Sequence, residues 1–112
     1  MAAVYTLHIE AGATCTRQFE YTNEDGTLFD LTGWTALMQI RTAPEAAEVA
    51  LEIIPDIDVP TAMLSFTISA TDTSTLLLPE YVYAMELTNT VSGEVIRLLQ
   101  GGVHVSAEVV RD

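Results

Sequence analysis

Two histidines and one cysteine, His8, His104 and Cys15, are the side chains best suited to metal or nucleophilic chemistry in this sequence. His8 and His104 fall in the first and last predicted strands, which could pair and bring the two imidazoles together. A zinc site needs further ligands at fixed spacing, and no such cluster is readable. Cys15 lies mid-strand on an apolar face, where a small buried thiol is expected. We therefore expect solvent-facing histidines, no metal site and no catalytic residue.

Two acidic segments, Asn23-Glu24-Asp25-Gly26 and Asp56-Ile57-Asp58, carry oxygen atoms of the kind that Ca²⁺ prefers. Neither fits the twelve-residue calcium loop with its terminal bidentate glutamate. Each has a sufficient explanation as a turn or loop, because Asp and Asn bond their own backbone and Gly26 supplies a positive φ. No glycine-rich phosphate loop and no nucleophile elbow is present. The sequence thus predicts a chain that is not an enzyme and that uses no cofactor.

The charge of the chain excludes several classes of partner. Among 112 residues there are 16 acids and 4 bases, which give a formal net charge of −12, and all four bases are arginines. Such a surface repels nucleic-acid phosphates and anionic membranes, so neither is an expected partner. The length predicts a single domain over residues 1–112. No signal peptide is readable at the N-terminus, so synthesis in a host cytoplasm is expected.

Short alternating segments separated by turn signals dominate the pattern, which is typical of an all-β sandwich or barrel with about seven or eight antiparallel strands. A double glycine, Gly101-Gly102, interrupts the last strand pattern and predicts a bulge. Pro55–Thr61 is predicted as a loop. Residues after Ser69 could form one helical turn, with Leu76 and Leu78 in the core. The predicted strands are Val4–Glu10, Thr14–Thr22, Trp34–Arg41, Val49–Ile54, Met63–Ser69, Tyr81–Thr88, Val95–Leu99 and Val103–Val105.

Five residues are expected to have structural roles. Trp34 shares a strand face with Ala36, Met38 and Ile40 and is predicted to anchor the core; an exposed carbohydrate-binding platform is the functional alternative. Gly33 precedes this strand in a turn opened by Asp30, where a positive φ is expected. Tyr81 or Tyr83 could form the tyrosine corner of immunoglobulin-like domains, in which the hydroxyl bonds the preceding turn.

A family pattern accompanies these features. The sequence resembles small structural proteins of tailed phages and prophages, and most specifically the immunoglobulin-like N-terminal domain of the phage baseplate upper protein. The most distinctive segments are Asp30-Leu31-Thr32-Gly33-Trp34 and Met38-Gln39-Ile40-Arg41. Others are Gly12-Ala13-Thr14, Phe19-Glu20-Tyr21, Asp25-Gly26-Thr27, Ser69-Ala70-Thr71-Asp72-Thr73, Tyr81-Val82-Tyr83-Ala84-Met85-Glu86-Leu87 and Val95–Val105. The resemblance implies a single immunoglobulin-like sandwich in a virion, at the tail or baseplate, with other virion proteins as partners.

Apolar residues at outward strand positions indicate protein contacts, including contacts with copies of the same chain. These positions are Leu37, Ala50, Val82, Ala84 and Val110. Val4–Glu10 and Val103–Val110 are expected to be edge segments open to strand addition. A capsid decoration or minor head protein is an alternative within the same class, and a carbohydrate-binding module for host attachment is an alternative of another class.

Overall fold

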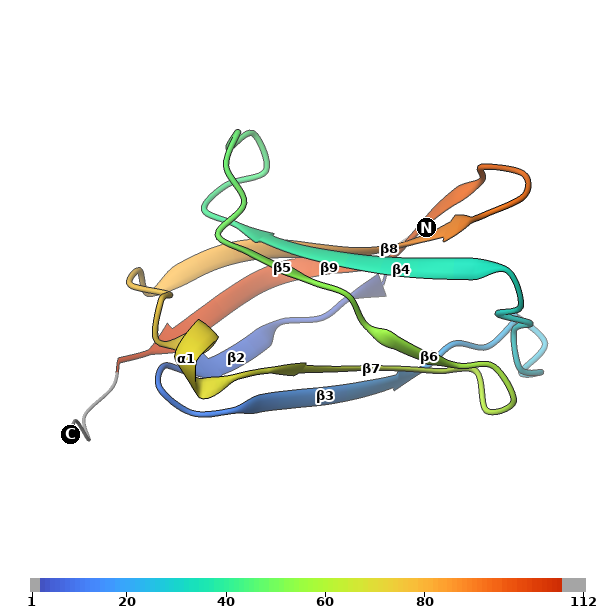
Figure 1. The fold of residues 1–112 in the computed structure, drawn as a ribbon, viewed down its shortest axis with the longest axis horizontal. Coiled ribbons are helices and arrows are strands. Elements are labelled where there is room, and N and C mark those ends of the chain that lie inside the picture. The colour runs from blue at the N-terminus through green and yellow to red at the C-terminus, as the bar shows by residue number, and fades with distance from the viewer. Residues whose placement is uncertain (1–2, 108–112) are drawn as a thin grey trace.

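Alternating apolar and polar residues produce two β-sheets whose apolar faces pack together. The structure, a computed structural model, describes residues 3–107 (Figure 1). The strands are β1 (Ala3–Val4), β2 (Leu7–Glu10), β3 (Cys15–Glu20), β4 (Trp34–Arg41), β5 (Leu51–Ile53), β6 (Asp56–Asp58), β7 (Met63–Ile68), β8 (Glu80–Asn89) and β9 (Val95–Ser106). The prediction of an all-β sandwich is confirmed.

The order of the strands is that of an immunoglobulin-like sandwich. One sheet has six strands in the order β1-β9-β8-β4-β5, with β2 also on β9, and the other has the order β3-β7-β6. Strands β3, β7 and β6 correspond to B, E and D of that fold, and β9, β8, β4 and β5 to G, F, C and C′. The outer face of the six-stranded sheet is turned away from the core.

The prediction that all strands are antiparallel is wrong for the first of them. Strands β1 and β2 both run parallel to β9, with Leu7 opposite Val103 and His8 opposite His104. After β2 the chain crosses to β3 in the other sheet, so no hairpin requires an antiparallel neighbour. Strand β9 lies between β8 and the first strands, so the prediction of an edge at Val103–Val110 is wrong for its described part. Val110 and the rest of 108–112 lie outside the described residues.

The core fills the space between the two sheets. Its fully buried side chains come from both inner faces, and they include Met38, Ile40, Leu64, Met85 and Leu87, each at most 1% exposed. Their strict alternation with outward residues is what the sequence predicted. The core is therefore correctly derived from period-two patterning.

Three local predictions failed, and the predicted helical turn after Ser69 was confirmed. Residues 56–58 form edge strand β6 rather than a loop. Strand β9 runs without a break through Gly101-Gly102, and its irregularity against β8 falls between Met85 and Glu86, where Leu98 is the extra residue. The short helix α1 (Ala70–Thr73) forms as expected, with the Ser69 hydroxyl accepting the Asp72 amide at its N-cap. Leu76 is buried beside it, whereas Leu78 is 48% exposed and does not reach the core.

Candidate functional site

A groove of about 510 Å³ crosses the outer face of the six-stranded sheet. Its floor contains Leu37 of β4 and Val82 and Ala84 of β8, which are three of the five outward apolar residues predicted from the sequence; Ala50 lies outside this groove. Figure 1 shows that the β4–β5 loop and the β8–β9 turn both project on this side of the sheet. We call this surface the outer groove; it is lined by Val4, Leu37, Gln39, Arg41, Pro44, Val82, Tyr83, Ala84, Glu86, Arg97, Gln100 and Gly101.

Arg41 fixes the loop that forms one side of the outer groove. Its guanidinium donates to the backbone oxygens of Ala46 and Ala47 at 2.8 and 3.1 Å. It also donates to Gln39 Oε1 at 2.9 Å, and Gln39 Nε2 donates to Glu52 Oε1 at 2.9 Å. The side of the groove is thus held by bonds from the sheet, so the cavity exists before any partner binds.

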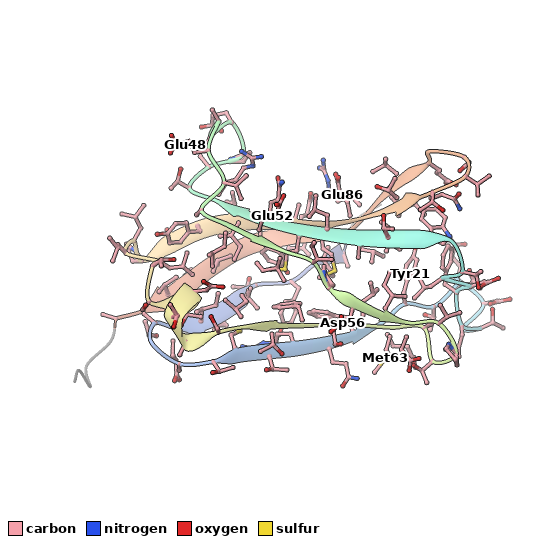
Figure 2. All side chains as sticks on the ribbon, viewed as in Figure 1. Tyr21, Glu48, Glu52, Asp56, Met63 and Glu86 are labelled. Atoms are coloured by element: carbon pink, nitrogen blue, oxygen red, sulfur yellow. The ribbon has the colours of Figure 1, made fainter. Side chains whose placement is uncertain are left out.

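Charges of both signs line the outer groove, namely Arg41, Arg97 and Glu86. Figure 2 shows Glu48, Glu52 and Glu86 on the outer side of the six-stranded sheet. Arg97 lies across from Glu86, with Nη2 and Oε2 3.6 Å apart, and both side chains remain about half exposed. Arg41 donates only to neutral oxygens and keeps its charge, so a bound partner meets an apolar floor with charges of both signs around it.

Trp34 lies at the margin of the core rather than at its centre. The indole is half-buried and packs edge-on against Phe29, with ring centroids 5.7 Å apart and an interplanar angle of 63°. Tyr21 also packs against Phe29, with ring centroids 4.7 Å apart. Because the indole is used in this aromatic cluster, the cluster supports the anchoring role better than a sugar platform.

The turn before Trp34 has the predicted backbone. Gly33 has a φ of +80°, and Asp30 Oδ1 accepts the Thr32 amide at 3.0 Å. Hydrogen bonds from the Thr32 side chain and amide lower the pKa of Asp30. The Gly33 carbonyl accepts the Thr90 amide and hydroxyl, which joins this turn to the β8–β9 turn.

Substitution of Gly33 by valine should lower the free energy of unfolding by about 2 kcal/mol, because a β-branched residue is strained at this φ. A Cβ here would meet only Thr90 Oγ1 at 3.9 Å, so the cost comes from the backbone and not from crowding. Urea denaturation measures the change. Gly33→Asn is the matched control and should lose clearly less, since Asn tolerates this conformation. Equal stability of the valine variant and the wild type would contradict the assignment.

Tyr81 forms the tyrosine corner. Its hydroxyl accepts the Leu78 amide at 3.1 Å, across the turn that leads into β8, and its ring is buried. Of the two tyrosines that the sequence offered, the structure places Tyr81 in this role. Tyr81→Phe should cost about 1 kcal/mol of stability, the ordinary value of a hydrogen bond whose partner is left behind. An unchanged urea midpoint would show that the corner contributes nothing.

Tyr83 has a different partner in the first strand segment. Its hydroxyl donates to the Tyr5 backbone oxygen at 2.7 Å, which holds the residues between β1 and β2 against β9. Burial, together with the neighbouring Tyr5, raises the pKa of Tyr83 from 10.0 to about 12. The folded state therefore favours the neutral phenol.

This shift gives a pH dependence with a definite sign. A folded pKa above the unfolded one contributes stability below the unfolded value, and that stability is lost as pH rises from 10.0 to about 12. The wild type should therefore lose stability across this window, and Tyr83→Phe should lose less. Urea midpoints at about pH 9 and about pH 11.5 measure the difference. Parallel losses in both proteins would contradict the role of Tyr83.

The residues that suggested metal or nucleophilic chemistry are placed as follows. Cys15 is buried, and burial raises the pKa of its thiol. Asp25 Oδ1 accepts the amide and hydroxyl of Thr27, and Asp58 Oδ2 accepts the Thr61 hydroxyl. Within residues 3–107, no group of three or more His, Cys, Asp or Glu side chains is arranged to hold a metal ion. No helix in this same range is long and apolar enough to cross a membrane.

Thr73 is a structural residue that the sequence did not single out. Its side chain is fully buried, and its hydroxyl accepts the Gly12 amide and bonds the Ala13 and Ala70 oxygens. These contacts join α1 to the β2–β3 turn, 60 residues away in sequence. A threonine within a run of Ser, Thr and Asp gives no local signal that separates it from its exposed neighbours.

Comparison with known proteins assigns this chain to no family. No protein-family model matches the chain, and no curated protein matches it in sequence.

Proposed function

We propose that this chain is a non-enzymatic structural protein of a tailed-phage particle, at the tail or baseplate, which works by protein–protein contact through the outer groove. The observation that carries the proposal is the apolar floor of Leu37, Val82 and Ala84 in a groove whose side is fixed by Arg41. A rigid sheet face binds without ordering a loop, which lowers the entropic cost of association. The resemblance of the sequence to phage structural proteins is the reason for placing the chain in a phage particle.

The partner in this proposal is another virion protein that presents apolar side chains flanked by lysine or arginine. The chain has a net charge of −12, so its surface as a whole is acidic, and Glu48, Glu52 and Glu86 lie on the same side of the molecule as the outer groove, whose lining also contains Arg41 and Arg97. Complementary charge raises the association rate and selects the register of docking, while the apolar contact supplies affinity. Free chains in the host cytoplasm repel one another by the same charge, which favours assembly only where a basic partner is present.

Proteomics and imaging of purified phage particles test whether the chain is a component of the virion. Particles should contain the chain in fixed stoichiometry, and deletion of its gene should leave particles with a missing density or a failed assembly step. The position of that density decides between the tail and the head. Particles that never contain the chain and that form normally without it would overturn the structural role.

Two variants test the surface. Leu37→Asp places a charge on the floor of the outer groove, whereas Leu77→Asp changes a leucine that is 86% exposed outside it. Incorporation into particles should fall at least tenfold for Leu37→Asp, because a charge is then buried against an apolar partner. Leu77→Asp should be incorporated normally. Circular dichroism shows whether both variants fold, and equal incorporation of the two would exclude the outer groove as the contact.

A further inference from the structure

His8 and His104 form a pair of exposed imidazoles on the outer side of the six-stranded sheet. They lie directly opposite each other in the parallel ladder of β2 and β9. Their ring centroids are 5.4 Å apart and their planes differ by 20°. Two nearly parallel imidazoles on adjacent strands can turn their nitrogen atoms toward one shared point above the sheet, since exposed side chains change rotamer freely.

Glu80 extends this pair into a row across three strands. It lies opposite His104 in the antiparallel ladder of β8 and β9, and its Oε1 is 3.6 Å from His104 Nδ1. A carboxylate beside one ring nitrogen favours the tautomer with the proton on that nitrogen, so Nε2 keeps the free lone pair. Carboxylates hold metal-binding histidines in the same manner, by orienting the ring and raising its basicity.

The other charged groups near the pair are few. Glu10 follows His8 by two residues on the same face of β2. The guanidinium of Arg17, from β3, donates to the His8 backbone oxygen at 2.9 Å and so lies at the sheet edge beside the pair. Two carboxylates and one guanidinium leave a local excess of negative charge, in a chain whose net charge is −12. This field favours a cation.

We propose that His8 and His104 bind one divalent transition metal ion between them, with Cu²⁺ preferred, and that Glu80 orients His104. Imidazole nitrogens suit copper, nickel and zinc, and the stability order of divalent ions places copper highest. Two protein ligands are fewer than the four of a closed structural zinc site, so water completes the coordination and the ion stays exchangeable. The site is independent of the outer groove and of the virion proposal.

The bound ion would join β2 to β9. Strand β2 is four residues long and pairs with β9 at the side of the sheet. A ligand that binds only the folded pairing raises stability in proportion to the logarithm of its concentration over the dissociation constant. Copper should therefore raise the melting temperature, and the gain should disappear when either histidine is removed.

Titration of the purified chain with CuSO₄, NiSO₄ and ZnSO₄ at neutral pH, followed by calorimetry, is the direct test. We expect one ion per chain, with copper bound most tightly. Electron paramagnetic resonance of the copper complex should show two imidazole nitrogens. Because metals take neutral imidazole, affinity should fall on acidification.

Variants separate this site from adventitious binding at the N-terminal amine or surface carboxylates. The double variant His8→Ala, His104→Ala measures that background, and each single variant should fall to it. Glu80→Gln should weaken copper binding about tenfold, the lower end of the effect of an orienting carboxylate, whereas the matched control Glu10→Gln should leave it close to the wild type. Both histidines are exposed, so the variants should fold. Copper affinity and nitrogen signals that persist in the double variant would overturn the proposal.

Discussion

Replacement of Trp34 by alanine should lower the free energy of unfolding by about 3 kcal/mol. The value lies at the lower end for a large aromatic because the indole is half-buried at the margin of the core. Its removal takes away the edge-on contact with Phe29 and leaves the Tyr21–Phe29 pair without its third ring. Since small domains have only about 5–15 kcal/mol of stability, this change is large.

Urea or guanidinium denaturation measures the effect of Trp34→Ala, followed by circular dichroism because the only tryptophan is lost. Leu77→Ala is the control: its side chain is 86% exposed, and its removal should change the midpoint little. A wild-type midpoint for Trp34→Ala would show that the indole anchors nothing. The carbohydrate-platform alternative would then regain support.

Gly101→Val should destabilise the chain by about 3 kcal/mol, the upper end for overpacking. A Cβ at Gly101 would overlap the Tyr5 carbonyl oxygen and lie 3.1 Å from its carbon. That carbonyl is the acceptor of the Tyr83 hydroxyl, and the Tyr5 amide donates to the Gln100 oxygen at 3.1 Å. Valine must therefore displace the segment between β1 and β2 from β9.

Gly102 offers a matched control for this prediction. An added Cβ there meets nothing within 4 Å, so Gly102→Val should cost much less than Gly101→Val. Hydrogen exchange identifies the segment concerned: the amides of Tyr5 and Leu7 should exchange faster in Gly101→Val only. Similar stability and exchange in the two variants would contradict the close approach of Tyr5.

Local patterning predicted those strands that have one face in the core. Trp34–Arg41 matches β4 residue for residue, because alternation is unambiguous when one face is buried. Strand β6 was missed because Pro55 and two aspartates read as a loop, yet an edge strand accepts both. The double glycine read as a bulge, whereas Gly101 gives space to Tyr5, a residue that no local window contains.

The candidate sites were likewise predicted from the sequence only in part. Outward apolar residues of β4 and β8 were predicted by alternation alone, but the outer groove also needs the β4–β5 loop. That loop is held by bonds from the Arg41 side chain to backbone oxygens, which leave no trace in sequence periodicity. The nearness of His8 and His104 was anticipated from strand pairing, while the parallel register that places them opposite each other was not.

The parallel pairing of β2 with β9 has a mechanical consequence. When a force pulls β2 toward its amino end and β9 toward its carboxyl end, these two parallel neighbours are pulled along each other. The bonds of the ladder, from Leu7–Val103 to Glu10–Ser106, then carry the load together in shear. An antiparallel pair that is pulled at one end instead opens bond by bond. The first and last strands thus give the sandwich its resistance to extension along its length.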